Sequence, residues 1–113
     1  MEKVSLGKQR LTPTFIGSWV MRPLSICDEL ITYFESNEQK HQKGITGVGI
    51  NLDRKDSTDV RVTPKDLKLP GNEIFVEYFQ KLYLCYQDYV AEWPFLNTFA
   101  ENLQISSFNL QRY

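Results

Sequence analysis

One long segment, residues 73–93, constrains the fold of this 113-residue chain more than any other part of the sequence. Its apolar side chains recur at steps of three and four, the spacing that aligns side chains along one face of an α-helix. Asn72 is a candidate N-cap, and Pro94 ends the pattern because its ring disfavours helical geometry at the preceding residue. The segment therefore predicts a long amphipathic helix that needs a broad apolar surface. Its apolar stripe comprises Phe75, Tyr78, Phe79, Leu82, Cys85, Tyr86, Tyr89 and Trp93.

A second amphipathic helix is predicted over residues 25–38. Ser25 followed by Asp28 resembles a capping box, in which the two side chains bond to backbone N–H groups of the first turn. We expect this helix to pack beside the longer one. Its apolar stripe at helical spacing comprises Ile26, Cys27, Leu30, Ile31 and Phe34.

Three stretches predict strands, and with the two helices they predict an α+β fold. Residues 14–21 are rich in β-branched and aromatic side chains, residues 60–63 alternate in polarity, and residues 108–113 end the chain in a second alternation. The expected architecture is two amphipathic helices packed on one face of a small, mainly antiparallel sheet. In the last strand Phe108, Leu110 and Arg112 are expected to face one way, and Asn109, Gln111 and Tyr113 the other.

Length and composition indicate one globular domain. A chain with 42% hydrophobic and 24% charged residues is ordinary for a soluble protein, and no internal boundary is apparent. We expect residues 1–13 to form a flexible N-terminal segment and residues 14–113 to form a single α+β domain. Residues 63–66 could open a single helical turn before the long helix.

Several function classes are disfavoured by charge and hydropathy. The net charge is −1, so the clustered Lys and Arg that bind nucleic-acid phosphates are missing from the sequence. No apolar run approaches the roughly 20 residues of a membrane span, and the polar start does not resemble a secretory signal. We therefore expect a cytoplasmic protein with no nucleic-acid or membrane partner.

Few residues are candidates for chemistry. Cys27 and Cys85 both fall on apolar helical stripes, which favours buried free thiols, with a disulfide as the alternative. The one histidine, His41, lies in a polar run and is expected to be exposed, with a metal ligand or base as the alternative. The aspartates at positions 53, 56 and 59 lack the spacing of an EF-hand, and the glycines at 44, 47 and 49 lack that of a dinucleotide-binding loop. Both stretches are interpreted as loops.

The order of several segments resembles the N-terminal half of an iron(II)- and 2-oxoglutarate-dependent oxygenase of the prolyl 4-hydroxylase-like group. These segments are FIGSWV, PLSICDELITYFE, RKDSTDVRV, the long tyrosine-rich helix and FNLQRY. The resemblance spans about residues 14–113, and its most specific parts are residues 55–59 and 109–113. It implies a partial double-stranded β-helix with its helical support layer, in an incomplete oxygenase domain.

The resemblance also implies that this chain does not supply the iron ligands of such an enzyme. Such enzymes bind Fe(II) through a His-x-Asp or His-x-Glu pair and a distal His, and His41 matches neither position. In the family that pair follows the strand that here ends at Tyr113, so the chain is expected to end before the metal motif. Tyr113 is the one residue at a family position that can contact 2-oxoglutarate. We expect the chain by itself to bind no iron and to be inactive.

Two functions follow from these observations. The first is a non-catalytic N-terminal portion of an oxygenase that hydroxylates a protein or a small molecule. The second is a complete small α+β interaction protein that acts through self-association or a protein partner. In the second, the strand Phe108 to Tyr113 is the expected interface, because an unpaired sheet edge and an uncovered apolar face both favour association.

Overall fold

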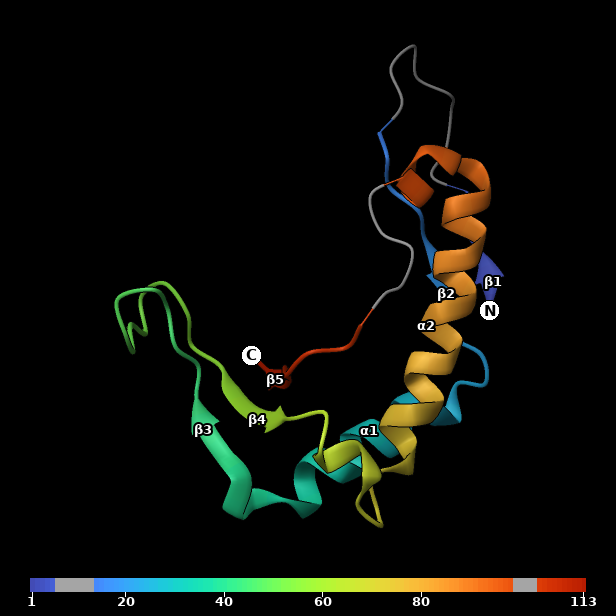
Figure 1. Ribbon diagram of the computed structural model, residues 1–113. Coiled ribbons are helices and arrows are strands. Elements are labelled where there is room, and N and C mark those ends of the chain that lie inside the picture. Colours follow the sequence, from blue (N-terminus) through green and yellow to red (C-terminus); the bar gives the residue numbers. More distant parts are fainter. Residues whose placement is uncertain (6–13, 99–103) are drawn as a thin grey trace.

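The structure is a computed structural model that describes residues 1–5, 14–98 and 104–113 (Figure 1). It confirms the α+β class. Within these ranges, no helix is both long enough and apolar enough to cross a membrane. The helices are α1 (Ser25–Ser36) and α2 (Glu73–Glu92), and short 3-10 helices cover Glu38–Lys40, Asp66–Lys68 and Pro94–Thr98. The strands are β1 (Glu2–Lys3), β2 (Trp19–Val20), β3 (His41–Lys43), β4 (Thr58–Val62) and β5 (Phe108–Arg112).

The larger sheet has the order β3-β4-β5, with both pairs antiparallel. Val60 in the central strand lies opposite His41 on one side and Leu110 on the other. The strand predicted at residues 60–63 is present as β4, which begins at Thr58 and ends at Val62. The strand predicted at residues 108–113 is present as β5, which ends at Arg112. Because β4 and β5 are separated by α2 in sequence, their pairing brings together two segments that are distant along the chain (Figure 1).

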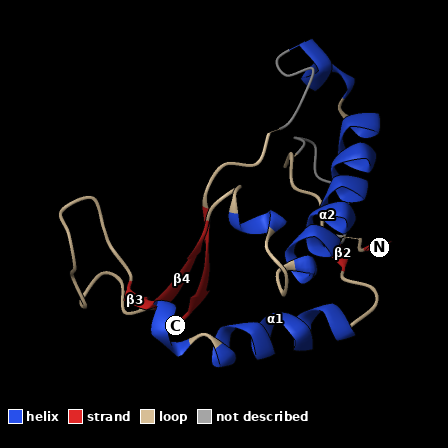
Figure 2. Cartoon of the chain, turned by 60° about the horizontal axis from the view of Figure 1, so that its bottom comes forward, coloured by secondary structure: helices blue, strands red, loops and turns tan. Residues whose placement is uncertain are grey.

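The hydrophobic core lies between this sheet and the two helices. It is formed by Ile26 of α1, Val62 of β4, and Ile74 and Phe75 of α2. Figure 2 shows α1 running beside the strands, with α2 rising from the same region. Side chains of β5 complete the core, since Phe108 packs against it on the face that alternation predicts. Apolar burial is therefore concentrated at the N-terminal half of α2.

Both helices form where their apolar spacing predicts, but their caps differ from expectation. Asn72 is the N-cap of α2, yet its side chain donates instead to the carbonyl oxygen of Asp66, at 2.7 Å, because that carbonyl lies within reach in the preceding turn. In α1 the N-cap is Leu24, so Ser25 is already helical and the capping box with Asp28 does not form. The stripe of α2 is also narrower than predicted, since Leu82 is exposed.

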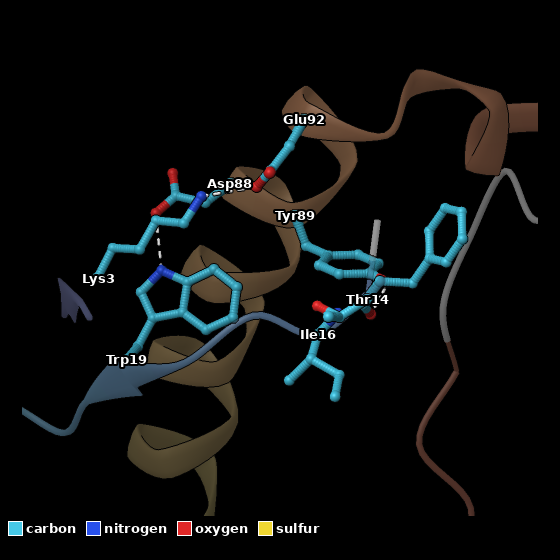
Figure 3. Close-up of polar contacts among 8 residues, drawn as sticks. Lys3, Thr14, Ile16, Trp19, Asp88, Tyr89 and Glu92 are labelled. Carbon is cyan, nitrogen blue, oxygen red and sulfur yellow. Dashed lines mark hydrogen bonds and ion pairs between the residues drawn. The ribbon is translucent and has the colours of Figure 1, made fainter. Parts of the chain in front are cut away.

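The N-terminal region packs along the C-terminal half of α2 (Figure 3). Trp19 donates through Nε1 to a carboxylate oxygen of Asp88 at 3.1 Å, and Tyr89 donates through its hydroxyl to the carbonyl of Phe15 at 2.6 Å. Only Trp19–Val20 of the strand predicted at 14–21 forms, as β2. It pairs with β1, so Glu2–Lys3 of the segment expected to be flexible are in a strand, while residues 6–13 lie outside the described part.

The predicted helical turn after β4 is present as Asp66–Lys68, and two hydrogen bonds join Asp66 to Thr63 at its start. The carboxylate of Asp66 accepts from the backbone N–H of Thr63 at 2.8 Å, and the Asp66 N–H donates to the Thr63 hydroxyl at 3.4 Å. These hydrogen bonds, the backbone one first, lower the pKa of Asp66 from its ordinary value of 3.8. The ionised carboxylate is thus favoured in the folded protein.

The lowered pKa of Asp66 predicts an acid-dependent contribution to stability. Its folded pKa lies below its unfolded one, so the contribution is complete above about 3.8 and is lost as the pH falls through the folded value. We expect Asp66→Asn to lower the melting temperature at neutral pH and to reduce its fall on acidification. Thermal unfolding between neutral pH and pH values well below 3.8 measures this. The exposed Asp53→Asn serves as the control, and an equal acid response in both variants would contradict the assignment.

Candidate functional site

The face of the sheet opposite the helices carries a buried polar cluster. Along β4, alternation directs Val60 and Val62 toward the helices, so Asp59 projects from the other face. Ser57 and Asp59 are both buried, at 2% and 6% exposed. With Lys55 and Gln111 they form what we call the Asp59 cluster. It joins the loop before β4 to the last strand of the sheet.

Both carboxylate oxygens of Asp59 accept hydrogen bonds within this cluster. Ser57 donates through its hydroxyl to Oδ1 at 2.8 Å, and Gln111 donates through Nε2 to Oδ2 at 3.1 Å. The ammonium of Lys55 lies 3.8 Å from Oδ2 and is mostly buried. A buried carboxylate is stable only when it is paired and hydrogen-bonded. Here two groups from the loop before β4 and one from β5 satisfy it.

Gly44 lets the chain pass close to the cluster. Its backbone N–H donates to the carbonyl of Ser57 at 3.0 Å. A Cβ atom at position 44 would collide with the Ser57 hydroxyl and would lie 2.7 Å from Cε of Lys55. Because Gly44 has no side chain, the two ends of the loop between β3 and β4 can approach each other here. The sequence placed Gly44 in a loop but did not predict this close contact.

The Asp59 cluster is self-contained. Among the described residues, every buried side-chain nitrogen or oxygen has a hydrogen-bond partner, so the cluster offers no unsatisfied group to a ligand. Asp56 does not join it, because its carboxylate lies 3.5 Å from Lys43. Asp53 and Asp56 thus belong to a polar loop, as predicted. The arrangement makes one face of the sheet polar and fixes the position of β5.

Iron does not fit the residues that the structure describes. Over residues 1–5, 14–98 and 104–113, no group of three or more His, Cys, Asp or Glu side chains is placed to hold a metal ion. His41 is not exposed in a connector as expected. It begins β3, half-buried, with Nε2 2.8 Å from the carbonyl oxygen of Phe34 and its ring stacked on Phe34 at 4.3 Å. Because the neighbours of His41 in sequence are polar, the sequence did not predict that its ring packs on Phe34.

The two cysteines lie in different environments and are not bonded to each other. Both are free thiols, with Cys85 buried and Cys27 exposed. The prediction of a buried thiol is therefore right for Cys85 and wrong for Cys27, because the buried stripe of α1 is centred on Ile26 and Phe34. Burial raises the pKa of the Cys85 thiol, which favours its protonated form.

Tyr113, the predicted 2-oxoglutarate contact, follows β5 directly and is 81% exposed. β5 ends at Arg112, so the orientation of Tyr113 on the same face as Gln111 stays a prediction from alternation. Its neighbour Arg112 turns the other way: the guanidinium donates to Glu35 at 2.9 Å and lies 4.9 Å from the ring centroid of Phe34. The cation beside Tyr113 is thus engaged on the helical side of the sheet.

The two most specific parts of the oxygenase resemblance, residues 55–59 and 109–113, meet in the pairing of β4 with β5. Asp59 lies directly opposite Gln111 in this pairing. The structure thus brings together residues that the sequence separates by a long helix. No protein-family model, curated protein or solved structure matches this chain.

Proposed function

We propose that this chain supplies the helical support layer and outer strands of an iron(II)- and 2-oxoglutarate-dependent oxygenase domain of the prolyl 4-hydroxylase-like group. Its residues 1–5, 14–98 and 104–113 contribute no set of iron ligands. The observation that carries the proposal is the two-sided sheet. Helices cover the apolar face, the Asp59 cluster makes the opposite face polar, and the exposed Tyr113 after β5 is the group that a polar cofactor can contact. The activity of such a domain would be hydroxylation of a protein or a small molecule.

The residues present support only part of this cofactor chemistry. The described residues do not provide a ligand set that fits iron. Tyr113 offers 2-oxoglutarate one phenolic donor, which can bind a carboxylate oxygen. Arg112 is held by Glu35 and does not supply the cation that a carboxylate would favour. The chain's own role is therefore to position strands and to contact the cofactor weakly.

Titration with 2-oxoglutarate tests this role. In the absence of metal, we expect the ligand to shift the backbone amide resonances of Tyr113 and its neighbours at millimolar concentration. Tyr113→Phe keeps the ring but removes the phenolic hydroxyl, so we expect it to abolish the shifts. A protein that acts only through protein contacts is not expected to bind 2-oxoglutarate at Tyr113. Absence of any shift at Tyr113 in the unaltered chain would therefore contradict the proposal.

Anaerobic addition of Fe(II) with 2-oxoglutarate tests the metal side. We expect no visible charge-transfer band and no metal uptake by calorimetry, because the described residues provide no ligand set. If a band forms, the proposal of a support layer without iron ligands is wrong. His41→Ala would then show whether the single histidine is one of the ligands.

A second candidate function is a protein-interaction module, which acts through self-association or a protein partner. The observation that favours it is the position of β5 at the edge of its sheet. Within the described residues, β5 pairs with β4 on one side only. Edge strands present unpaired N–H and C=O groups that readily accept another strand.

A further inference from the structure

The two edges of the larger sheet differ in their capacity to accept a strand. β3 has three residues, all polar, and includes Lys43. Short, charged edges of this kind resist pairing. β5 has five residues, among which Arg112 carries the one charge, and alternate backbone groups point away from β4. The β5 edge is the more receptive of the two.

We propose that β5 pairs antiparallel with β5 of a second copy of this chain, about a two-fold axis at Leu110. The inference rests on the second candidate function and specifies its partner and register. In this register Leu110 lies opposite its own counterpart. Phe108 lies opposite Arg112 of the second copy, and Asn109 lies opposite Gln111. The two sheets then join into one, with all the helices on the same face.

Side-chain alternation excludes the registers that are shifted from this one by a single residue. Phe108 and Leu110 face the helices, and pairing about a residue keeps the helix-facing residues of both copies on one face. A slip by one residue would place Phe108 opposite a residue of the polar face. This register also keeps the two Arg112 charges apart. They lie four residues from each other along the strand direction, about 14 Å at ~3.4 Å per residue. At that separation their repulsion is largely screened.

An apolar groove beside β5 also favours a second copy of this chain as the partner. It lies between α1 and β5, and Ile31 at its rim is 61% exposed. Because Leu110 lines the groove and lies on the proposed axis, the groove of each copy meets that of the other. Pairing would therefore bury both Ile31 side chains together with the strand edges. The groove is lined by Leu30, Ile31, Phe34, Glu35, Leu110, Gln111 and Arg112.

Two double variants with matched substitutions test the register. Asn109→Lys with Gln111→Lys places lysine opposite lysine twice in the dimer, whereas Asn109→Glu with Gln111→Lys places glutamate opposite lysine twice. Both variants keep a donor at position 111 for Asp59, which preserves the contact that Gln111 makes. Circular dichroism and thermal unfolding serve to check that each variant is folded before its association is measured.

Sedimentation equilibrium measures the association. We expect the unaltered chain and the Glu/Lys variant to sediment at twice the mass of the chain. The Lys/Lys variant should dimerise at least about tenfold more weakly than the Glu/Lys variant, because like charges directly opposite each other repel. A monomeric unaltered chain would overturn both the proposed interface and self-association as a function. A dimer that the Lys/Lys variant leaves intact would overturn only the register.

Discussion

Replacement of Phe75 by alanine is expected to lower the free energy of unfolding by about 3–5 kcal/mol, the usual loss for a buried phenylalanine. Phe75 is 2% exposed, and its ring lies 4.7 Å from that of Tyr33 and 5.5 Å from that of Phe108. It therefore joins α2 to both α1 and β5. Urea denaturation followed by circular dichroism measures the change.

Tyr83→Ala is the matched control for this substitution. Tyr83 lies on the same helix but is 53% exposed, so its truncation removes little buried surface. We expect it to cost less than about 1 kcal/mol, in line with surface substitutions. If Phe75→Ala cost no more than Tyr83→Ala, the core would not be centred where α1, α2 and β5 meet.

Replacement of Asp59 by alanine is expected to cost about 2–3 kcal/mol. The change removes the acceptor of both Ser57 and Gln111 and leaves Lys55 without its partner. Removing one member of a buried ion pair typically costs 3–5 kcal/mol, and the partial exposure of Lys55 reduces that value. Asp56→Ala, which removes an exposed partner of Lys43, should be nearly neutral.

A second substitution separates the two causes of this loss. In Asp59→Ala with Lys55→Met, the unpaired cation is gone and its aliphatic stem is retained. We expect this double variant to regain part of the lost free energy of unfolding, measured by the same urea denaturation. If the double variant were less stable than Asp59→Ala, Lys55 would contribute by its charge through contacts other than Asp59.

The longest elements of the fold could be predicted from sequence because their signals are local. The apolar spacing of α1 and α2 and the alternation of β4 and β5 each repeat over several residues, so both helices and both strands appear where expected. β1 and β3 were not predicted. Each has two or three mostly polar residues and forms only because a partner strand lies beside it.

The Asp59 cluster illustrates what local patterns omit. Lys55, Ser57 and Asp59 alternate along an extended chain, which places them on one face, and this spacing was a signal that the loop interpretation passed over. Their burial, however, depends on Gln111 and on the missing side chain of Gly44. These contacts link residues distant in sequence, which periodicity does not reveal. Alternation over residues 108–113 predicts that Tyr113 faces the same way as Gln111, whereas its contact with 2-oxoglutarate rests on the resemblance alone.

The pairing of β4 with β5 also bears on how the chain reaches its folded state. Val62 and Phe108 are neighbours across the sheet, and residues 63–107 form the loop that their contact closes. Closing such a loop lowers the chain entropy before the contact between the strands stabilises the fold. Non-local pairing of this kind therefore slows folding. α2 shortens the effective loop if it forms first. The rate at which the polar face and its Asp59 cluster assemble therefore depends on how early the long aromatic helix forms.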